Sequence, residues 1–227
     1  MLEFAEYESE KKPLVTVIWL HGLGSDGDDF KALIPELELP ADFPIRFIFP
    51  HAPLRQVTIS DHAVLRAWYD IRCHQTLADE DEHGIRESAK QIFQLIKQER
   101  KRGIPASKII LTGFSQGGAM ALFVGLRYPE KLGGIITLSG YLSLYHTLDK
   151  EMSPANRNIP IWMGHGKKDK RVPFDGGEKS RDILKEKGLE VEWHEYRMGH
   201  SVCCQELADI SEHIQKIAQI PQVAEKK

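Results

Sequence analysis

The stretch from residue 109 to residue 127 constrains the fold of this chain more than any other. The apolar run 109–112 (IILT) leads directly into 113–118 (GFSQGG), and good helix formers follow up to Arg127. In a strand that turns sharply into a helix at G-x-S-x-G, the serine is exposed at the tip of the turn. Glycine is needed on both sides of it, because a Cβ there would collide with neighbouring backbone. The segment therefore predicts a strand–turn–helix unit with Ser115 as a nucleophile.

Further short apolar runs have the composition of buried strands. Between them lie segments of helical periodicity, and Gly103 and Gly188 are expected to end two of these helices. Because parallel strands need crossovers that cover the sheet, this alternation favours an α/β fold with a mostly parallel central sheet. The fold class predicted is the α/β-hydrolase fold, a three-layer α/β/α sandwich without a cap domain. The predicted strands are 14–20, 45–49, 109–112, 134–138, 161–164 and 191–196, and the helices with clear apolar stripes lie near 85–102 and 207–217.

Composition and charge exclude several classes of function. With 227 residues, of which 41% are hydrophobic, the chain can bury one large core. We expect a single domain over residues 1–220 and a frayed tail at 221–227. The net charge of −3 does not indicate a basic surface that would bind nucleic acid. No apolar run reaches the length of a transmembrane segment, and the N-terminus lacks the pattern of a secretory signal.

The cysteines bear on the cellular compartment. Cys73 and the adjacent Cys203 and Cys204 make an odd count and a poor disulfide framework. Free thiols are typical of a reducing compartment. A cytoplasmic protein is therefore expected.

A glycine-punctuated loop follows the first apolar run. Within 21–24 (HGLG), the Leu23 amide can lie beside the Gln116 amide, so that two N–H groups bind the oxygen of a tetrahedral intermediate. His21 precedes the nucleophile and follows a core strand. A structural role in holding the loop is favoured for His21 over a catalytic one.

The acid and the base of a triad in this fold follow the serine in chain order. Asp169 comes after a strand that leaves the sheet through a glycine turn, at the edge where open α/β sheets build their sites. Asp175 is the rival, but it stands at the start of a helix and is explained more simply as an N-cap. His200 lies in a short loop between the last strand and the last helix, where a base can lean over the nucleophile. The triad predicted is Ser115, His200 and Asp169.

The other histidines and cysteines indicate no metal site. His194 lies within a predicted strand and His213 on the terminal helix, so both are better interpreted as structural or solvent-facing. Neither Cys73-His74 nor Cys203-Cys204 has the spacing of a zinc cluster. The predicted chemistry needs no metal and no cofactor.

Taken together, these segments resemble the phospholipase/carboxylesterase family of small α/β-hydrolases, which includes the acyl-protein thioesterases. In that family the matching serine, aspartate and histidine form the triad, and the amides at the positions of Leu23 and Gln116 form the oxyanion hole. One departure is visible at 60–62 (SDH), where members often have an Asn-Gly-Gly-like turn at the rim of the acyl site. The resemblance spans nearly the whole chain and is carried by 21–30 (HGLGSDGDDF), 67–70 (AWYD), 113–118, 165–169 (HGKKD) with 172–173 (VP), and 198–201 (MGHS).

The resemblance implies a serine carboxylesterase that acts on short- to medium-chain acyl esters or thioesters. Acylated proteins and lysophospholipids are the native substrates that it suggests, and a homodimer is left open. A peptidase and a non-catalytic binding module on the same fold are the alternatives. The long loops 50–84 and 141–158 are candidates for substrate contacts. We also expect a partly apolar acyl pocket with Trp68 as a substrate-binding residue, whereas Phe114 is more simply a core residue.

Overall fold

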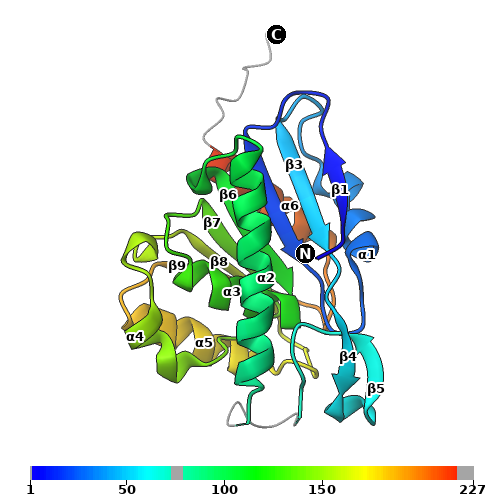
Figure 1. Ribbon diagram of the computed structural model, residues 1–227, viewed down its shortest axis with the longest axis vertical. Helices are drawn as coiled ribbons and strands as arrows, with labels where there is room; N and C mark the ends of the chain where they lie inside the picture. Colours follow the sequence, from blue (N-terminus) through cyan, green and yellow to red (C-terminus); the bar gives the residue numbers. More distant parts are fainter. Residues whose placement is uncertain (1, 73–78, 219–227) are drawn as a thin grey trace.

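The protein is built on a central seven-stranded sheet with the order β1-β3-β2-β6-β7-β8-β9 (Figure 1). The computed structural model describes residues 2–72 and 79–218. Strand β1 pairs with β3 in the antiparallel direction, and all the other neighbours in this sheet are parallel. The strands are β1 (Phe4–Glu8), β2 (Val15–Leu20), β3 (Ile45–Pro50), β6 (Ile109–Phe114), β7 (Gly134–Leu138), β8 (Ile161–Gly166) and β9 (Val191–Tyr196).

Helices cover both faces of the sheet and give the three layers that the sequence predicts. One hydrophobic cluster joins the sheet to α2, α3 and α5, and a second joins the opposite face to α1 and α6. In Figure 1, α2 and α3 lie in front of the sheet and α6 lies behind it. None of the helices in the described ranges is long and apolar enough to cross a membrane. The α-helices are α1 (Gly27–Lys31), α2 (Glu82–Lys101), α3 (Gln116–Arg127), α4 (Leu148–Glu151), α5 (Phe174–Glu186) and α6 (Cys204–Ala218), and short 3₁₀ turns occur at Ile34–Leu37, Thr58–Ser60, Ala106–Lys108, Tyr145–Thr147 and Pro154–Asn156.

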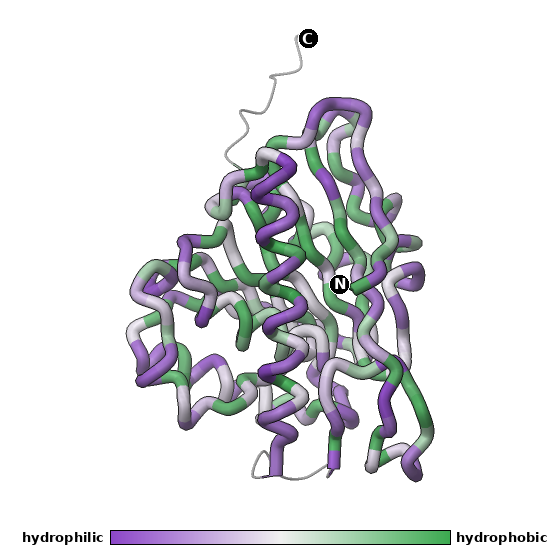
Figure 2. Tube along the Cα trace, viewed as in Figure 1, coloured by the Kyte–Doolittle hydropathy of each residue, from purple (hydrophilic) through white to green (hydrophobic). Residues whose placement is uncertain are grey.

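The core lies along the central strands. Every residue of β2 and β3 is buried, because helices pack on both sides of the sheet. Helix α2 is covered on one side only, so hydrophobic and hydrophilic residues alternate along it (Figure 2). The helix ends at Gly103 and Gly188 are confirmed, since both glycines have a positive φ just after a helix.

All six predicted strands are present, but three further strands were missed. Strand β1 (FAEYE) is a half-exposed edge strand in which polar residues interrupt the apolar ones. Strands β4 (Leu54–Val57) and β5 (Ala63–Arg66) form a separate hairpin inside the stretch predicted as a loop. The predicted tail at 221–227 lies outside the described residues, so the C-terminal limit of the domain stays a prediction.

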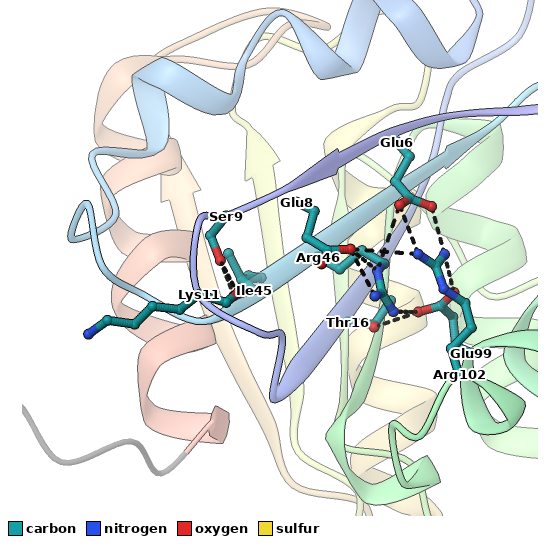
Figure 3. A network of polar contacts seen from close by, with 9 residues as sticks. All are labelled: Glu6, Glu8, Ser9, Lys11, Thr16, Ile45, Arg46, Glu99 and Arg102. Carbon is teal, nitrogen blue, oxygen red and sulfur yellow. Dashed lines mark hydrogen bonds and ion pairs between the residues drawn. The ribbon is translucent and has the colours of Figure 1, made fainter.

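A buried ionic network ties α2 to the edge of the sheet (Figure 3). The Arg46 guanidinium on β3 is 8% exposed and lies 2.8 Å from a carboxylate oxygen of Glu99 and 2.8 Å from one of Glu8. The Thr16 hydroxyl donates to Glu99 at 2.8 Å, and Arg102 contacts Glu99 at 3.0 Å. Strands β2 and β3 and the end of α2 therefore meet at the Glu99 carboxylate, and β1 joins them through the Glu8–Arg46 pair.

We expect Glu99→Ala to lower the free energy of unfolding by about 3 kcal/mol, because it leaves the buried Arg46 charge without its most buried partner. Urea unfolding measures the change. Lys11→Ala is the matched control, since the Lys11–Asp42 pair is more than half exposed on both sides and is expected to contribute much less to stability. Equal losses in the two variants would contradict a stabilising role for this network.

Candidate active site

Ser115 occupies a strained turn between a strand and a helix. Strand β6 ends at Phe114 and α3 begins at Gln116, and Ser115 between them has φ 55° and ψ −119°. Its amide donates to the Leu138 carbonyl at 2.8 Å, and its carbonyl accepts from the Ala119 amide at 3.0 Å. A non-glycine residue in this region is held there only by its surroundings, and such strain is typical of functional sites.

The two glycines of the motif are required for steric reasons, as the sequence predicts. A Cβ at Gly113 would overlap the carbonyl oxygen of Gly117. A Cβ at Gly117 would overlap the carbonyl oxygen of Leu20 on β2. The turn can therefore approach β2 this closely only with glycine at both positions.

The structure brings Ser115, His200 and Asp169 into one chain of hydrogen bonds. The Ser115 hydroxyl lies 2.9 Å from Nε2 of His200, and Nδ1 of the same ring lies 2.7 Å from Oδ2 of Asp169. Since a carboxylate only accepts hydrogen bonds, the Nδ1–H donates to Asp169, which leaves Nε2 to accept from the serine. This is the tautomer that a general base needs.

Asp169 is held in its ionised form. Its second oxygen, Oδ1, accepts the backbone amides of Arg171 at 2.9 Å and Val172 at 3.0 Å. Burial raises the pKa of Asp169, but the hydrogen bonds from His200 and the Arg171 amide outweigh it, so the pKa lies below its usual value. The carboxylate can therefore stabilise a positive charge on His200.

Asp175, the rival acid, is placed differently from the expectation. It was expected to cap a helix, but α5 begins at Phe174 with Pro173 at the N-cap position, so Asp175 lies in the first turn. Its carboxylate is exposed and accepts the amide of Gly176 at 3.0 Å. The N-cap interpretation is wrong, because the helix begins two residues earlier than that interpretation requires, with Pro173 at the N-cap.

The loop after β2 is fixed by His21. Nε2 of His21 accepts the Ala52 amide at 2.9 Å, and Nδ1 lies 2.7 Å from the Gly22 carbonyl oxygen. Burial lowers the pKa of His21 to about 4, so the ring stays neutral at neutral pH. The structural role expected for His21 is therefore seen.

Leu23 and Gln116, the expected oxyanion-hole residues, both line the cavity that contains Ser115. Among the described residues, neither backbone amide donates a hydrogen bond to the protein. Both amides are therefore available to a ligand oxygen.

Trp68 lies away from the place expected for a substrate-binding residue. It is fully buried and does not line the cavity over Ser115. Its indole N–H donates to the His21 carbonyl at 2.8 Å, and its backbone amide donates to the Gln116 side chain at 2.9 Å. The other end of that amide group donates to the Tyr69 carbonyl at 2.7 Å. Trp68 thus connects the loop that contains Leu23 to Gln116, on the side away from the cavity. The expectation that Trp68 contacts the substrate directly is therefore corrected.

A cavity of about 1180 Å³ opens over Ser115 and His200. Phe114 lines it and contacts the His200 ring with the ring centres 4.7 Å apart and the ring planes tilted by 41°. Phe114 also packs against the core, which is the position that the sequence favoured. Ser60 also borders the cavity, next to the departure noted at 60–62. Ten of the lining residues come from the stretches predicted as long loops, and for those outside 67–70 length was the only signal. The apolar and aromatic part of the lining is Leu23, Phe30, Ile59, Tyr69, Ile71, Phe114, Tyr141, Tyr145, Val172 and Pro173.

Potential metal ligands come together at one place within the described ranges, on residues outside the proposed triad. Asp26, Asp28 and His51 each have a ligating atom within 4.8 Å of the others. Asp26 caps α1 by accepting the amide of Asp28, and His51 accepts the amide of Gly27. These bonds account for the grouping, and the absence of a metal stays a prediction.

Comparison with known proteins agrees with this geometry. A profile of the phospholipase/carboxylesterase family matches residues 4–218. Acyl-protein thioesterase 1 of Neurospora crassa is 39% identical over 221 residues, which cover 93% of this chain and 89% of that protein. The Gibberella zeae protein of the same name is 37% identical, with 88% and 89% covered. Among solved structures, Zea mays acyl-protein thioesterase 2 superimposes with a TM-score of 0.85 at 28% identity, covering 96% of this chain and all of that one.

Proposed function

Because the chain belongs to the phospholipase/carboxylesterase family and is a serine hydrolase of esters or thioesters, we propose that Ser115, His200 and Asp169 carry out its reaction. The observation that carries this proposal is the unbroken chain of hydrogen bonds from the serine hydroxyl through the imidazole to the carboxylate. No other arrangement among the described residues that line this cavity joins a nucleophile to a base in this way.

The reaction has two halves on this proposal. His200 takes the proton of Ser115 as the serine oxygen attacks the acyl carbonyl, and it gives that proton to the departing alcohol or thiol. Water then attacks the acyl-enzyme by the same route and releases the acid. Asp169 holds the imidazole in its tautomer and stabilises its cation.

The amides of Leu23 and Gln116 are the proposed oxyanion hole. Both belong to residues that line the cavity, and both lack protein acceptors among the described residues. The Gln116 amide also begins α3, so the positive end of the helix dipole faces the developing charge. Hydrogen bonds of this kind are stronger in the transition state than in the ground state.

Acyl esters and thioesters of small molecules, acylated proteins and lysophospholipids are the proposed substrates, and a cytoplasmic location is proposed with them. The curated relatives are named acyl-protein thioesterases, which supports acylated proteins. The described cysteines, Cys203 and Cys204, are free thiols, which supports a reducing compartment. Cys73 lies outside the described residues.

Covalent labelling tests the nucleophile directly. A fluorophosphonate is expected to form an adduct on the peptide that contains residues 113–118, identified by mass spectrometry after proteolysis. An adduct on another serine in active enzyme would contradict the proposal.

The size and lining of the cavity predict a preference for medium acyl chains. Each buried methylene contributes about 0.8 kcal/mol, so kcat/KM is expected to rise about fourfold per methylene until the apolar wall ends. We expect p-nitrophenyl butyrate to octanoate to exceed both acetate and palmitate, measured as kcat/KM over the series. A flat series, or a maximum at palmitate, would show that the apolar wall does not hold the acyl chain.

A further inference from the structure

His165 is a buried histidine that lies beside Asp169 and takes no part in the proposed proton transfers. It belongs to β8, and its side chain is 1% exposed. The indole of Trp193 on β9 stacks on the imidazole with the ring centres 6.1 Å apart, and the ring of Phe174 meets it edge-on at 5.8 Å. A Cβ at Gly177 of α5 would come within 2.5 Å of Nδ1. The imidazole is therefore held in one orientation between the sheet and α5.

The hydrogen-bond partner of His165 determines its tautomer. Nε2 lies 2.9 Å from the Val172 carbonyl oxygen, and because a carbonyl only accepts, the hydrogen is on Nε2. Nδ1 has no partner among the described residues. Burial lowers the pKa of His165, and the Val172 carbonyl and the Asp169 carboxylate oppose this shift without cancelling it. The ring is therefore a neutral hydrogen-bond donor at neutral pH.

Val172 connects this donor to the proposed acid. Its carbonyl accepts from His165, and its amide donates to Oδ1 of Asp169 at 3.0 Å, beside the Arg171 amide at 2.9 Å. The other carboxylate oxygen, Oδ2, accepts from Nδ1 of His200 at 2.7 Å. If Val172 moves, Oδ1 loses one of its two amides and the carboxylate can turn away from His200.

The geometry gives His165 no direct part in proton transfer. Its Nε2 lies 3.6 Å from Oδ2 of Asp169, which is too long for a hydrogen bond. Nε2 already carries a hydrogen, and Nδ1, the nitrogen that could take a proton, lies against Gly177. The ring can therefore hold Asp169 only through Val172.

We propose that His165 is a positioning residue for the proposed triad, and that its Nε2–H group holds Val172 so that Asp169 stays turned toward His200. The proposal rests on the proposed function, because it concerns the acid of the same triad. Residues behind a catalytic group keep it in its productive geometry. A misplacement of about 1 Å can lower the rate by about 10²-fold, so the loss of this hold is measurable.

Two substitutions of similar length separate the hydrogen bond from the packing of the ring. His165→Gln keeps an N–H donor that can reach the Val172 carbonyl, whereas His165→Met has no donor. The rate constant for fluorophosphonate labelling, followed by mass spectrometry of the peptide with residues 113–118, measures the reactivity of Ser115 alone. We expect His165→Met to be labelled about 10²-fold more slowly than wild type, and His165→Gln within about fivefold of it. Equal losses in the two variants would overturn the proposal.

His213→Met is the matched control for removing a buried histidine. Burial lowers the pKa of His213 as it does that of His165, but His213 lies on α6 and its Nδ1 is 3.2 Å from Glu192. Its rate of labelling should match the wild type. A loss as large as that of His165→Met would show that the effect is not specific to the hold on Val172, and the proposal would fail.

A double-mutant cycle shows whether His165 acts through Asp169. If His165 only positions the carboxylate, its substitution has little left to remove once Asp169→Asn has replaced that carboxylate. We expect His165→Met to slow labelling by less than about threefold in the Asp169→Asn background, against about 10²-fold in the wild-type background. Additive effects of the two substitutions would contradict the proposed role.

Histidine NMR of the wild-type protein provides a test that does not depend on the folding of His165→Met. The ¹⁵N shifts of His165, assigned by their loss in His165→Gln, should show a neutral ring with its hydrogen on Nε2 at neutral pH. A protonated ring, or a hydrogen on Nδ1, would overturn the proposal.

Failure of this inference can be distinguished from failure of the proposed function. If Ser115 is labelled in the wild type and far more slowly in Asp169→Asn, the proposed triad stands and the His165 variants judge the positioning role alone. If Asp169→Asn is labelled as fast as the wild type, the proposed triad itself is wrong.

Discussion

Ser115→Ala is expected to lower kcat/KM for every ester substrate by about 10⁴-fold or more, with no loss of stability. The variant keeps the fold because alanine can occupy the same turn: the contacts that hold residue 115 are its backbone bonds to Leu138 and Ala119. It loses the nucleophile, and only binding and the oxyanion amides remain to assist water. Steady-state kinetics and a thermal melt measure the two quantities.

A control separates the chemistry from a general effect of removing a serine. Ser107 is exposed and lies before β6, away from the cavity, so Ser107→Ala should keep kcat/KM within a factor of two. A Ser115→Ala variant that melts with the wild type and retains a tenth of its activity would show that another group attacks the ester.

Asp169→Asn is expected to lower kcat by about 10⁴-fold while the melting temperature stays near that of the wild type. The structure gives the reason. The amides of Arg171 and Val172 donate to one side of the carboxyl, so the asparagine oxygen will turn to them and its NH₂ group will face His200. Nδ1 of His200 must then accept, which places the hydrogen on Nε2, and Nε2 can no longer take the serine proton.

Asp175→Asn is the matched control, since it makes the same chemical change on an exposed carboxylate in the first turn of α5. We expect its kcat to stay within about threefold of the wild type. If Asp175→Asn proves the more damaging of the two substitutions, the acid has been assigned to the wrong residue.

The strands and the turn at Ser115 could be predicted because local sequence determines them. Strand β6 is a continuous apolar run, and the two glycines of the turn have steric reasons that operate within a few residues. The edge strand β1 and the hairpin of β4 and β5 lack such a signal. Leu54 and Val64 of the hairpin are 64% and 60% exposed, so no buried face imposes an alternation on its sequence.

The residues around the nucleophile were harder to predict because an aromatic side chain packs in the core or lines a cavity equally well. Trp68 was expected in the cavity wall but is buried outside it, whereas Phe114 packs against the core as expected and lines the cavity as well. The pairing of Tyr69 with Tyr141 joins residues 72 positions apart, which no local pattern reveals. Only tertiary contacts decide such positions.

The order of the strands also decides when the enzyme can first become active during its synthesis. Ser115 follows β6, Asp169 follows β8 and His200 follows β9, and these strands add one after another toward the edge of the sheet. The nucleophile therefore leaves the ribosome 85 residues ahead of its base. A nascent chain that has folded only as far as β8 holds a serine with nothing to activate it, so hydrolysis waits until the last strand has paired.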